Sequence, residues 1–384
     1  MSSKNAFINK LAAFLPNAPV SNDQMEGILG QTGDRPSRAR KLILRSNKIT
    51  SRHYAIDPST GKSNYTNAQL AAEAIRGLIN EKTPLDDVEL LACSTTIPDQ
   101  IIPNHAVMVH GELGAPTLEA VSTAGVCVCG VTALRYAYLG IKAGEVKHAV
   151  ACASEAVSSS LRSDQFFNEN DDQIENLKRN PEVEFEKDFL RWMLSDGAGA
   201  AWLSDSPTEN GISLRVEWID VLSYAHEMST CMYAGAVKND DGSLTGWKTI
   251  PQTNSSESAS CMTITQDVKQ LNEHILTYTI EKPLTQIAKK RNLNPEQYDY
   301  FLPHFSSGYF EDRVADSLER INFSIPKSKW FTNLFSKGNT GSASIYIILE
   351  ELFNSGKLKS GEKILCHIPE SGRFTAAFMQ LTVV

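Results

Sequence analysis

The segment STAGVCVCGVTALRYAYLGIKAG, residues 122–144, carries the clearest fold signal in the sequence. Small residues recur in it at spacings of three or four, at Gly130, Ala133, Ala137, Gly140 and Gly144. This spacing puts them on one face of a helix, and a face without large side chains lets the helix approach its neighbours closely. The segment therefore predicts a buried helix, with Cys127 and Cys129 at its start.

A cysteine at the start of a helix is well placed for nucleophilic chemistry. The unsatisfied N–H groups and the helix dipole at that point favour the thiolate, which is the reactive form. The alternative is a pair of small buried thiols, because cysteine is among the most buried residue types. A metal site explains the Cys127–Cys129 pair less well, because zinc needs further ligands at a recognisable spacing and no second Cys or His pair is evident. We therefore expect no metal.

Helical and strand patterns alternate on both sides of this segment. Helices are expected at 67–81, 104–113 and 340–353, and a longer helix interrupted at Pro283 within 264–291. Apolar runs of strand length occupy 88–94, 148–154, 198–204, 212–222, 298–304, 362–368 and 374–384. This alternation predicts an α/β fold. A turn-rich stretch at 205–211 divides the chain into two halves with a similar order of elements, 1–207 and 208–384.

Two polar stretches do not fit this alternation. Residues 161–190 are rich in acidic side chains, and residues 225–262 carry clusters of Ser, Asn, Gly and Asp. Such composition is typical of solvated loops. We expect both to be surface excursions from the core.

Composition and charge narrow the class of protein. The chain has 384 residues, of which 41% are hydrophobic and 21% charged, as in a globular protein. No apolar run reaches the roughly 18 residues of a membrane span, and no secretory signal is expected. The net charge of −8 disfavours a general role with nucleic acid. Seven cysteines are too sparse for a disulfide scaffold, so we expect reduced thiols in the cytoplasm.

Three further residues lie at positions where catalytic groups are commonly found. His304, in FLPHFSSG, follows an expected strand and is either a loop histidine or a proton donor and acceptor. Asn339, in GNTG, is either a helix cap or an amide donor to a carbonyl group. Gly372, in ESGRFT, is either a turn glycine or the source of an N–H group for an oxyanion hole.

In combination, these motifs resemble a known family. Cys127 in a small-residue helix, the Pro303–His304 pair, GNTGSAS at 338–344 and SGRFT at 371–375 follow the order found in condensing enzymes of the thiolase superfamily. The chain is most similar to the β-ketoacyl-[acyl-carrier-protein] synthase III branch, and DGAGAA at 196–201 agrees with it. The resemblance implies the thiolase fold, with a duplicated five-layer α-β-α-β-α architecture, and a homodimer.

The resemblance also selects the nucleophile. The helix of that family ends in a K-x-G pattern, which corresponds to Lys142 and Gly144 in this sequence. That register places the catalytic cysteine at Cys127 and puts Cys129 where the family usually has glycine. Cys129 therefore stays open as the alternative nucleophile.

The remaining site residues follow from the same correspondence. His304 and Asn339 match the residues that donate hydrogen bonds to the second substrate. The N–H groups of Cys127 and Gly372 match the oxyanion hole. Ile102, in TTIPDQIIPN at 95–104, matches a residue that lines the acyl tunnel of the partner subunit. The substrates implied are thioesters of coenzyme A or of an acyl carrier protein, with no cofactor.

The implied reaction is a Claisen-type condensation, and several versions of it remain open. Residues 35–55, GVCVCG and PESGRFT resemble the ketosynthases of bacterial dialkylresorcinol and aryl-polyene clusters. That subfamily implies joining a β-ketoacyl unit to an α,β-unsaturated acyl unit, which gives a cyclohexanedione precursor. The alternatives are the initiation synthase III of fatty-acid synthesis, and a Cys-dependent acyltransferase or thioester hydrolase on the same fold. A thiol redox protein is a further class that the sequence disfavours.

An acidic carrier protein needs a basic docking patch on this net-negative chain. Lys289, Lys290 and Arg291 end an expected helix shortly before His304 and are candidates. A second basic cluster lies within residues 35–45. The alternative is an ordinary solvated surface, since Lys and Arg are common at helix C-termini.

Overall fold

The computed structural model describes residues 4–31, 40–163, 190–239, 241–250 and 261–384. In these residues, nine strands form one mixed sheet in the order β13-β14-β15-β8-β1-β7-β6-β4-β5. One group of neighbours is β1 (Phe7–Phe14), β7 (Gly197–Ser204), β6 (His148–Glu155), β4 (Leu90–Thr95) and β5 (Glu119–Ala124). The other is β13 (Tyr300–Pro303), β14 (Lys363–Glu370), β15 (Thr375–Val383) and β8 (Leu214–Ser223). The first group lies before residue 207 and the second after residue 208.

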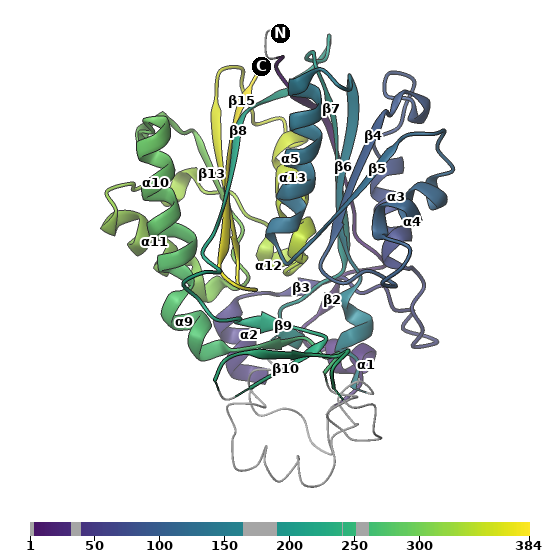
Figure 1. Cartoon of the computed structure of the whole chain (residues 1–384), viewed down its shortest axis with the longest axis vertical. Helices are drawn as coiled ribbons and strands as arrows, with labels where there is room; N and C mark the ends of the chain where they lie inside the picture. Colours follow the sequence, from purple (N-terminus) through teal and green to yellow (C-terminus); the bar gives the residue numbers. More distant parts are fainter. Residues whose placement is uncertain (1–3, 32–39, 164–189, 240, 251–260) are drawn as a thin grey trace.

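The two groups of strands are joined only weakly. β1 and β8 pair at Phe7–Arg215 and Ile8–Leu214 and then diverge, which leaves room for helices between the groups. Figure 1 shows the resulting five layers. The inner helices are α5 (Val128–Ala143) and α13 (Ser344–Phe353). The outer ones are α3 (Asn67–Arg76) and α4 (His105–Leu113) on one side, and α10 (Lys282–Arg291) and α11 (Glu311–Arg320) on the other. The expected α/β class and α-β-α-β-α architecture are confirmed.

The central helices are apolar on several sides because each meets both groups of strands. In α13, the five consecutive residues from Ile345 to Leu349 are all buried. α5 approaches α13 closely at Gly130, whose carbonyl oxygen accepts a hydrogen bond from the Tyr346 hydroxyl at 2.9 Å. A Cβ atom at Gly130 would collide with the carbonyl oxygen of Ser342. The small-residue face expected from the sequence therefore serves close contact between helices.

Gly130→Ala is expected to lower the free energy of unfolding by about 1–3 kcal/mol, because the helices must separate to admit one methyl group. Gly111→Ala is the matched control. Gly111 lies in α4 with no heavy atom within 4 Å of the corresponding Cβ position. There the change should stabilise by about 0.5–1 kcal/mol through helix propensity. Urea denaturation of both variants measures the two effects, and equal effects of one sign would contradict this account.

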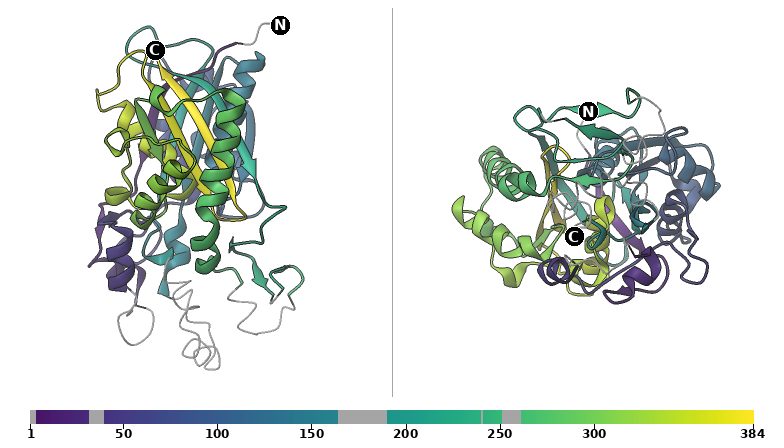
Figure 2. Two further views of the ribbon diagram at one scale, coloured as in Figure 1. Left: turned by 90° about the vertical axis from the view of Figure 1, so that its left-hand side faces the viewer. Right: turned by 90° about the horizontal axis from the view of Figure 1, so that it is seen from below.

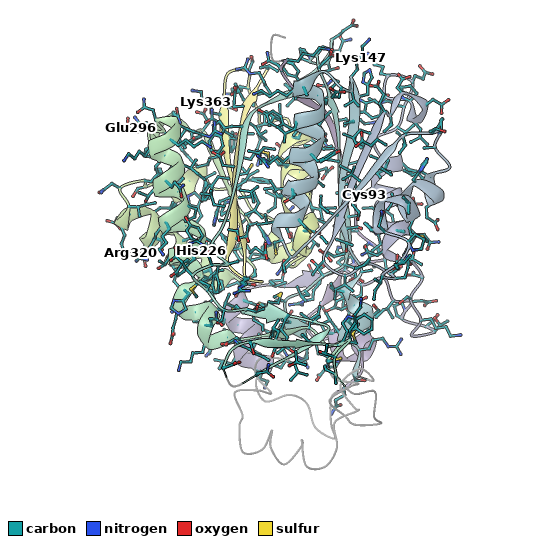
Figure 3. The ribbon with its side chains drawn as sticks, viewed as in Figure 1. Cys93, Lys147, His226, Glu296, Arg320 and Lys363 are labelled. Atoms are coloured by element: carbon teal, nitrogen blue, oxygen red, sulfur yellow. The ribbon has the colours of Figure 1, made fainter. Side chains whose placement is uncertain are left out.

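The expected catalytic residues lie at one end of the molecule. β4 is parallel to β5 and β6, and β13 is parallel to β14. Figure 3, in which side chains fill the space between the layers, labels Lys147 and Lys363 at the end where β6 and β14 begin. These strands therefore finish at the opposite end, the lower one in Figure 1. Carboxyl ends of parallel strands are where α/β proteins usually place their sites.

Short elements cover that lower end, as Figure 1 and the left view of Figure 2 show. They are β2 (Val20–Ser21), α1 (Met25–Leu29), α2 (Arg40–Asn47), β3 (Ser51–Arg52), β9 (Met232–Tyr233), β10 (Ala236–Lys238), β11 (Leu244–Gly246), β12 (Thr265–Gln266) and α12 (Leu334–Lys337). Residues 225–262 were expected to be a surface excursion, but Cys231 is fully buried. That expectation is wrong for the part near Cys231. Residues 164–189, most of the other expected excursion, lie outside the described residues.

The long helix expected within 264–291 is interrupted, as the sequence indicated. α9 (Val268–Leu276) passes into a π-helical turn, Thr277–Glu281, and α10 then begins with Pro283 in its first turn. Single π-helical turns commonly occur at functional sites. Within the described residues, no helix is both long enough and apolar enough to cross a membrane.

Candidate active site

Cys127 lies at the junction between β5 and α5. It is the N-cap residue of α5, and its side chain is partly exposed. Cys129, by contrast, is buried two residues further along, where its N–H group donates to the Val126 carbonyl at 3.0 Å. Cys127 lines a cavity, and Cys129 does not belong to that lining. The structure therefore separates two thiols that the sequence left as alternatives.

The cavity that Cys127 lines is mainly apolar. It lies between the π-helical turn, the ends of β13 and β14, and the start of α11 (Figure 1). Its apolar walls include Leu271, Ile275, Ile280, Phe305, Phe310 and Val314. His304 and His367 supply imidazole groups to the same lining. An apolar pocket with a few polar groups is the usual form of a small-molecule site.

His304 directly follows β13, as expected. Its backbone N–H donates to the His367 carbonyl at 2.8 Å, which continues the pairing of β13 with β14. The side chain is buried, and this burial lowers the pKa of His304 to about 4. Its imidazole is therefore neutral near pH 7, and a neutral imidazole can donate one hydrogen bond to a carbonyl oxygen.

Asn339 is buried and held by its own backbone. Its N–H donates to the Met193 carbonyl at 3.0 Å, and its carbonyl accepts from the Ser195 N–H at 2.8 Å. The side-chain Oδ1 accepts from the Gly341 N–H at 3.0 Å, which orients the carboxamide. Asn339 lies in the turn before α13 but is not part of the cavity lining formed by Cys127 and His304.

Gly372 lies in the turn between β14 and β15, close to the start of α5. A Cβ atom there would lie 3.1 Å from the Cγ2 atom of Val126, the residue before Cys127. The Gly372 carbonyl accepts from the N–H groups of Cys231 at 2.9 Å and Met232 at 3.2 Å. The segment around β9 therefore fixes this turn, a role that no local sequence pattern indicated.

Gln266 strengthens the same turn. Its Nε2 donates to the Cys231 carbonyl at 3.1 Å, and its Oε1 accepts from the Ser371 hydroxyl at 3.1 Å. Ser371 also lines the cavity. The turn that carries Gly372 is thus tied to β12 as well as to β9.

Glu155, at the end of β6, is a further buried group that the sequence analysis did not single out. Its Oε1 accepts from the Thr96 hydroxyl at 2.6 Å and from the Ser342 hydroxyl at 2.6 Å. The backbone N–H groups of these two residues also donate to it, at 3.1 and 3.2 Å. Glu155 therefore connects the end of β4 to the GNTGSAS turn, which positions the start of α13 beside α5.

The protonation of Cys127 differs from the expectation. The helix dipole suggested a thiolate, but burial raises the pKa of the Cys127 thiol, and the charges of Glu155 and Glu370 raise it further. Desolvation here outweighs the effect of the helix terminus. Cys127 is therefore a thiol near neutral pH and must lose its proton as a substrate reacts.

Alkylation of Cys127 by iodoacetamide should therefore accelerate about tenfold per pH unit up to about pH 9, because only the thiolate reacts and its fraction keeps rising below the raised pKa. Peptide mapping at several pH values measures the rate at this one cysteine. A plateau near pH 7 would show instead that the thiolate is the resting form.

The remaining predicted residues lie away from the cavity. Ile102 is 84% exposed, and the neighbouring Ile101 is 68% exposed. Lys290 and Arg291 both bind the carboxylate of Asp220 on β8.

The C-terminal end of α10, which carries these basic residues, lies at the opposite end of the molecule from His304. Lys289, Lys290 and Arg291 precede the short turn that contains Glu296, which Figure 3 places at the end where β14 begins. His304 follows the other end of β13. The second basic cluster is different, since its described members lie on α2 at the lower end (Figure 1). Docking at either surface stays a prediction.

Comparisons with known proteins agree with this fold. The 3-oxoacyl-[acyl-carrier-protein (ACP)] synthase III C-terminal family matches residues 288–369. β-Ketoacyl-[acyl-carrier-protein] synthase III of Clostridium perfringens is 26% identical over 366 residues, which cover 94% of each chain. OleA of Xanthomonas campestris, solved with bound lauric acid and lauroyl-CoA, has a TM-score of 0.74 at 18% identity, with 99% of each chain covered. The synthase III of Pseudomonas aeruginosa has a TM-score of 0.70 at 19% identity, over 99% of this chain and 98% of that one.

The chain is accordingly an enzyme similar to β-ketoacyl-[acyl-carrier-protein] synthase III, whose members are condensing enzymes of the acyltransferase class, and it has the thiolase fold. Similarity to the Clostridium perfringens enzyme extends over nearly the whole chain and is not confined to the C-terminal part. The likeness to the solved structures supports the assignment of the fold.

Proposed function

We propose that this enzyme forms carbon–carbon bonds by Claisen-type condensation of acyl thioesters through an acyl-enzyme on Cys127. The observation that carries the proposal is that Cys127, at the start of α5, and His304, after β13, line the same apolar cavity. A nucleophile, a neutral imidazole donor and an apolar wall are what an acyl thioester requires. The acyl donors are thioesters of coenzyme A or of an acyl carrier protein.

In the first half-reaction, the sulfur of Cys127 attacks the thioester carbonyl and the donor thiol leaves. The N–H groups of Cys127 and Gly372 stabilise the oxyanion, a role supported by the proximity of the Gly372 turn to Val126. In the second half-reaction, His304 and Asn339 donate hydrogen bonds to the carbonyl of a second thioester as it becomes an enolate. The enolate then attacks the acyl-enzyme and releases Cys127. No metal or other cofactor takes part.

The finer proposal concerns the two acyl units. We assign the nucleophile to a β-ketoacyl unit and the acyl-enzyme to an α,β-unsaturated unit, which together give a cyclohexanedione precursor of a dialkylresorcinol. The support is the sequence likeness of residues 35–55, GVCVCG and PESGRFT to that subfamily. Polyketide-type and fatty-acid-type chemistry differ here in the second substrate, so a substrate panel separates them.

We also propose that the enzyme acts as a homodimer in which Ile102 lines the acyl tunnel of its partner. The support is the exposure of Ile101 and Ile102, together with the position of β5 at the end of the nine-stranded sheet, where it pairs only with β4 among the residues that the structure describes. Association with a second copy of the chain commonly covers an exposed strand edge and the apolar side chains next to it.

Intact mass after incubation with a panel of acyl-CoAs and acyl-carrier thioesters tests the function. The expected result is one acyl adduct, mapped to Cys127, and a product with a longer carbon skeleton after a second thioester is added. Release of the free acid alone would favour a thioester hydrolase. Absence of any adduct while Cys127 is still alkylated by iodoacetamide would contradict covalent acyl transfer.

A further inference from the structure

Glu370 is an acidic side chain beside the Gly372 turn that the mechanism above does not use. It is the last residue of β14 and lies between Pro369 and Ser371, which line the cavity, whereas Glu370 itself is not part of that lining. Its Oε1 atom lies 2.5 Å from the position that a Cβ atom on Gly372 would take. That same position lies 3.1 Å from Val126, so the carboxyl group, the Gly372 turn and the start of α5 meet at one place.

The carboxyl group is also close enough to Cys127 to influence it. The charge of Glu370 contributes to the raised pKa of Cys127, and also to that of Cys129. Burial raises the pKa of Glu370 itself to about 7, although the Arg373 N–H and the Thr375 hydroxyl oppose this shift. A carboxylate in this state is a stronger base than an exposed one and is still partly ionised at neutral pH.

The two imidazole groups that line the cavity are poorer bases. Burial lowers the pKa of His304 to about 4 and that of His367 to about 3. His367 in addition donates from Nε2 to the Thr279 carbonyl at 2.9 Å and stacks on Phe378. Glu155 does not line the cavity, and its Oε1 already accepts from the hydroxyl groups of Thr96 and Ser342.

We propose that Glu370 is the general base that removes the α-proton of the second thioester, so that the enolate forms by deprotonation and without loss of CO2. This inference rests on the proposed function and specifies its second substrate. The α-carbon of a β-ketoacyl thioester lies between two carbonyl groups, which makes its proton unusually acidic. A carboxylate at the Gly372 turn, which carries the proposed oxyanion donor, would accept that proton while His304 donates to the thioester oxygen.

The step balances without any further reactant. The C–H bond of the second thioester breaks, its proton moves to a carboxylate oxygen of Glu370, and its electron pair forms the enolate. The enolate carbon attacks the carbonyl carbon of the acyl-enzyme, and the bond to the Cys127 sulfur breaks. The departing thiolate takes the proton back from Glu370, which returns both groups to their starting forms. Neither oxidation nor reduction occurs.

The test separates the two half-reactions in Glu370→Gln. Loading of Cys127 from an enoyl-CoA is followed by intact mass, and condensation is then started with a β-ketoacyl-CoA and followed by product mass. Loading should be as fast as in the wild type or faster, because removing the charge of Glu370 lowers the pKa of the Cys127 thiol. Condensation should fall about 10²–10⁴-fold, the usual contribution of a general base. Structural damage would slow both steps together.

Two further variants sharpen the result. Glu370→Asp keeps a carboxyl group and should load Cys127 normally, with a condensation rate between those of the wild type and Glu370→Gln. Glu296→Gln makes the same change at an exposed residue at the far end of the molecule, labelled in Figure 3, and should leave both rates unchanged. It is the matched control for a change from carboxylate to amide.

Several results would overturn the proposal. Condensation by Glu370→Gln at the wild-type rate would do so, as would release of one CO2 per product by a wild type that accepts only malonyl thioesters. If the wild type shows no acyl group on Cys127 with any thioester, the proposed function itself fails. That outcome is visible before the second substrate is added, so the two failures are distinguishable.

Discussion

Cys127→Ala is expected to eliminate the acyl adduct and to reduce condensation by about 10⁴-fold or more, which is the scale seen when a covalent nucleophile is removed. In the proposed mechanism the sulfur of Cys127 carries the acyl group between the two half-reactions, and the partly exposed Cys127 lines the cavity. Intact mass after incubation with the preferred acyl thioester measures the first effect. Product formation under saturating thioesters measures the second.

Cys129→Ala is the matched control, since it removes a thiol of the same size two residues away. Cys129 is buried inside α5, and its carbonyl oxygen accepts from the Thr123 hydroxyl at 2.9 Å, a contact that alanine preserves. This variant should keep the acyl adduct and most of the activity. If the adduct instead persists in Cys127→Ala and disappears in Cys129→Ala, the nucleophile has been assigned to the wrong cysteine.

The sequence could predict those parts of the fold in which local pattern and burial agree. The small-residue spacing around Gly130 indicated a tightly packed helix, and α5 is buried between the two groups of strands. The strand before His304 was evident because a short apolar run ends there in polar residues. β1 was missed because its sequence, FINKLAAF, interrupts the apolar run with polar residues. Its position in the middle of the sheet comes from pairing with β7, about 190 residues away along the chain.

Contacts between distant segments account for what sequence reasoning missed at the site. Nothing near Cys231 or Gln266 indicates that they hold the Gly372 turn, because those hydrogen bonds join residues that only the fold brings together. The same applies to Glu155 and Glu370, since an acidic residue at the end of a strand is usually solvated. Burial changes the pKa of such a group, and burial is a property of the tertiary structure.

The basic residues show that closeness in sequence does not imply closeness in space. Lys290 and Arg291 precede His304 by few residues, but the whole of β13 lies between them. They also bind Asp220, and the Arg291 guanidinium lies 4.6 Å from the centroid of the Trp218 ring. The ion pairs with Asp220 therefore partly neutralise the positive charge of Lys290 and Arg291. α2, at the end of the molecule that carries the cavity, is the better placed of the two basic surfaces for a carrier protein (Figure 1).

His304→Ala is expected to separate the half-reactions in a different way from any change at Cys127. Condensation should fall about 10²–10³-fold, the cost of losing one donor to a developing oxyanion. Loading of Cys127 should change by less than about tenfold, because the N–H groups of Cys127 and Gly372 stabilise the first intermediate. The reason lies in the state of His304, whose burial keeps its imidazole neutral near pH 7 and so able to donate. Stopped reactions analysed by intact mass give both rates from one sample.

His304→Gln tests whether donation is the property that matters. Its carboxamide N–H can replace the imidazole donor, so this variant should recover part of the condensation rate lost in His304→Ala, whereas a change that only disturbed the cavity walls would not be rescued. Equal loss of loading and condensation in His304→Ala would contradict the assignment. It would mean that His304 takes the proton of Cys127, whose raised pKa requires some acceptor during acylation. Because His304 and Cys127 line one cavity, the split between the two rates decides which half-reaction His304 serves.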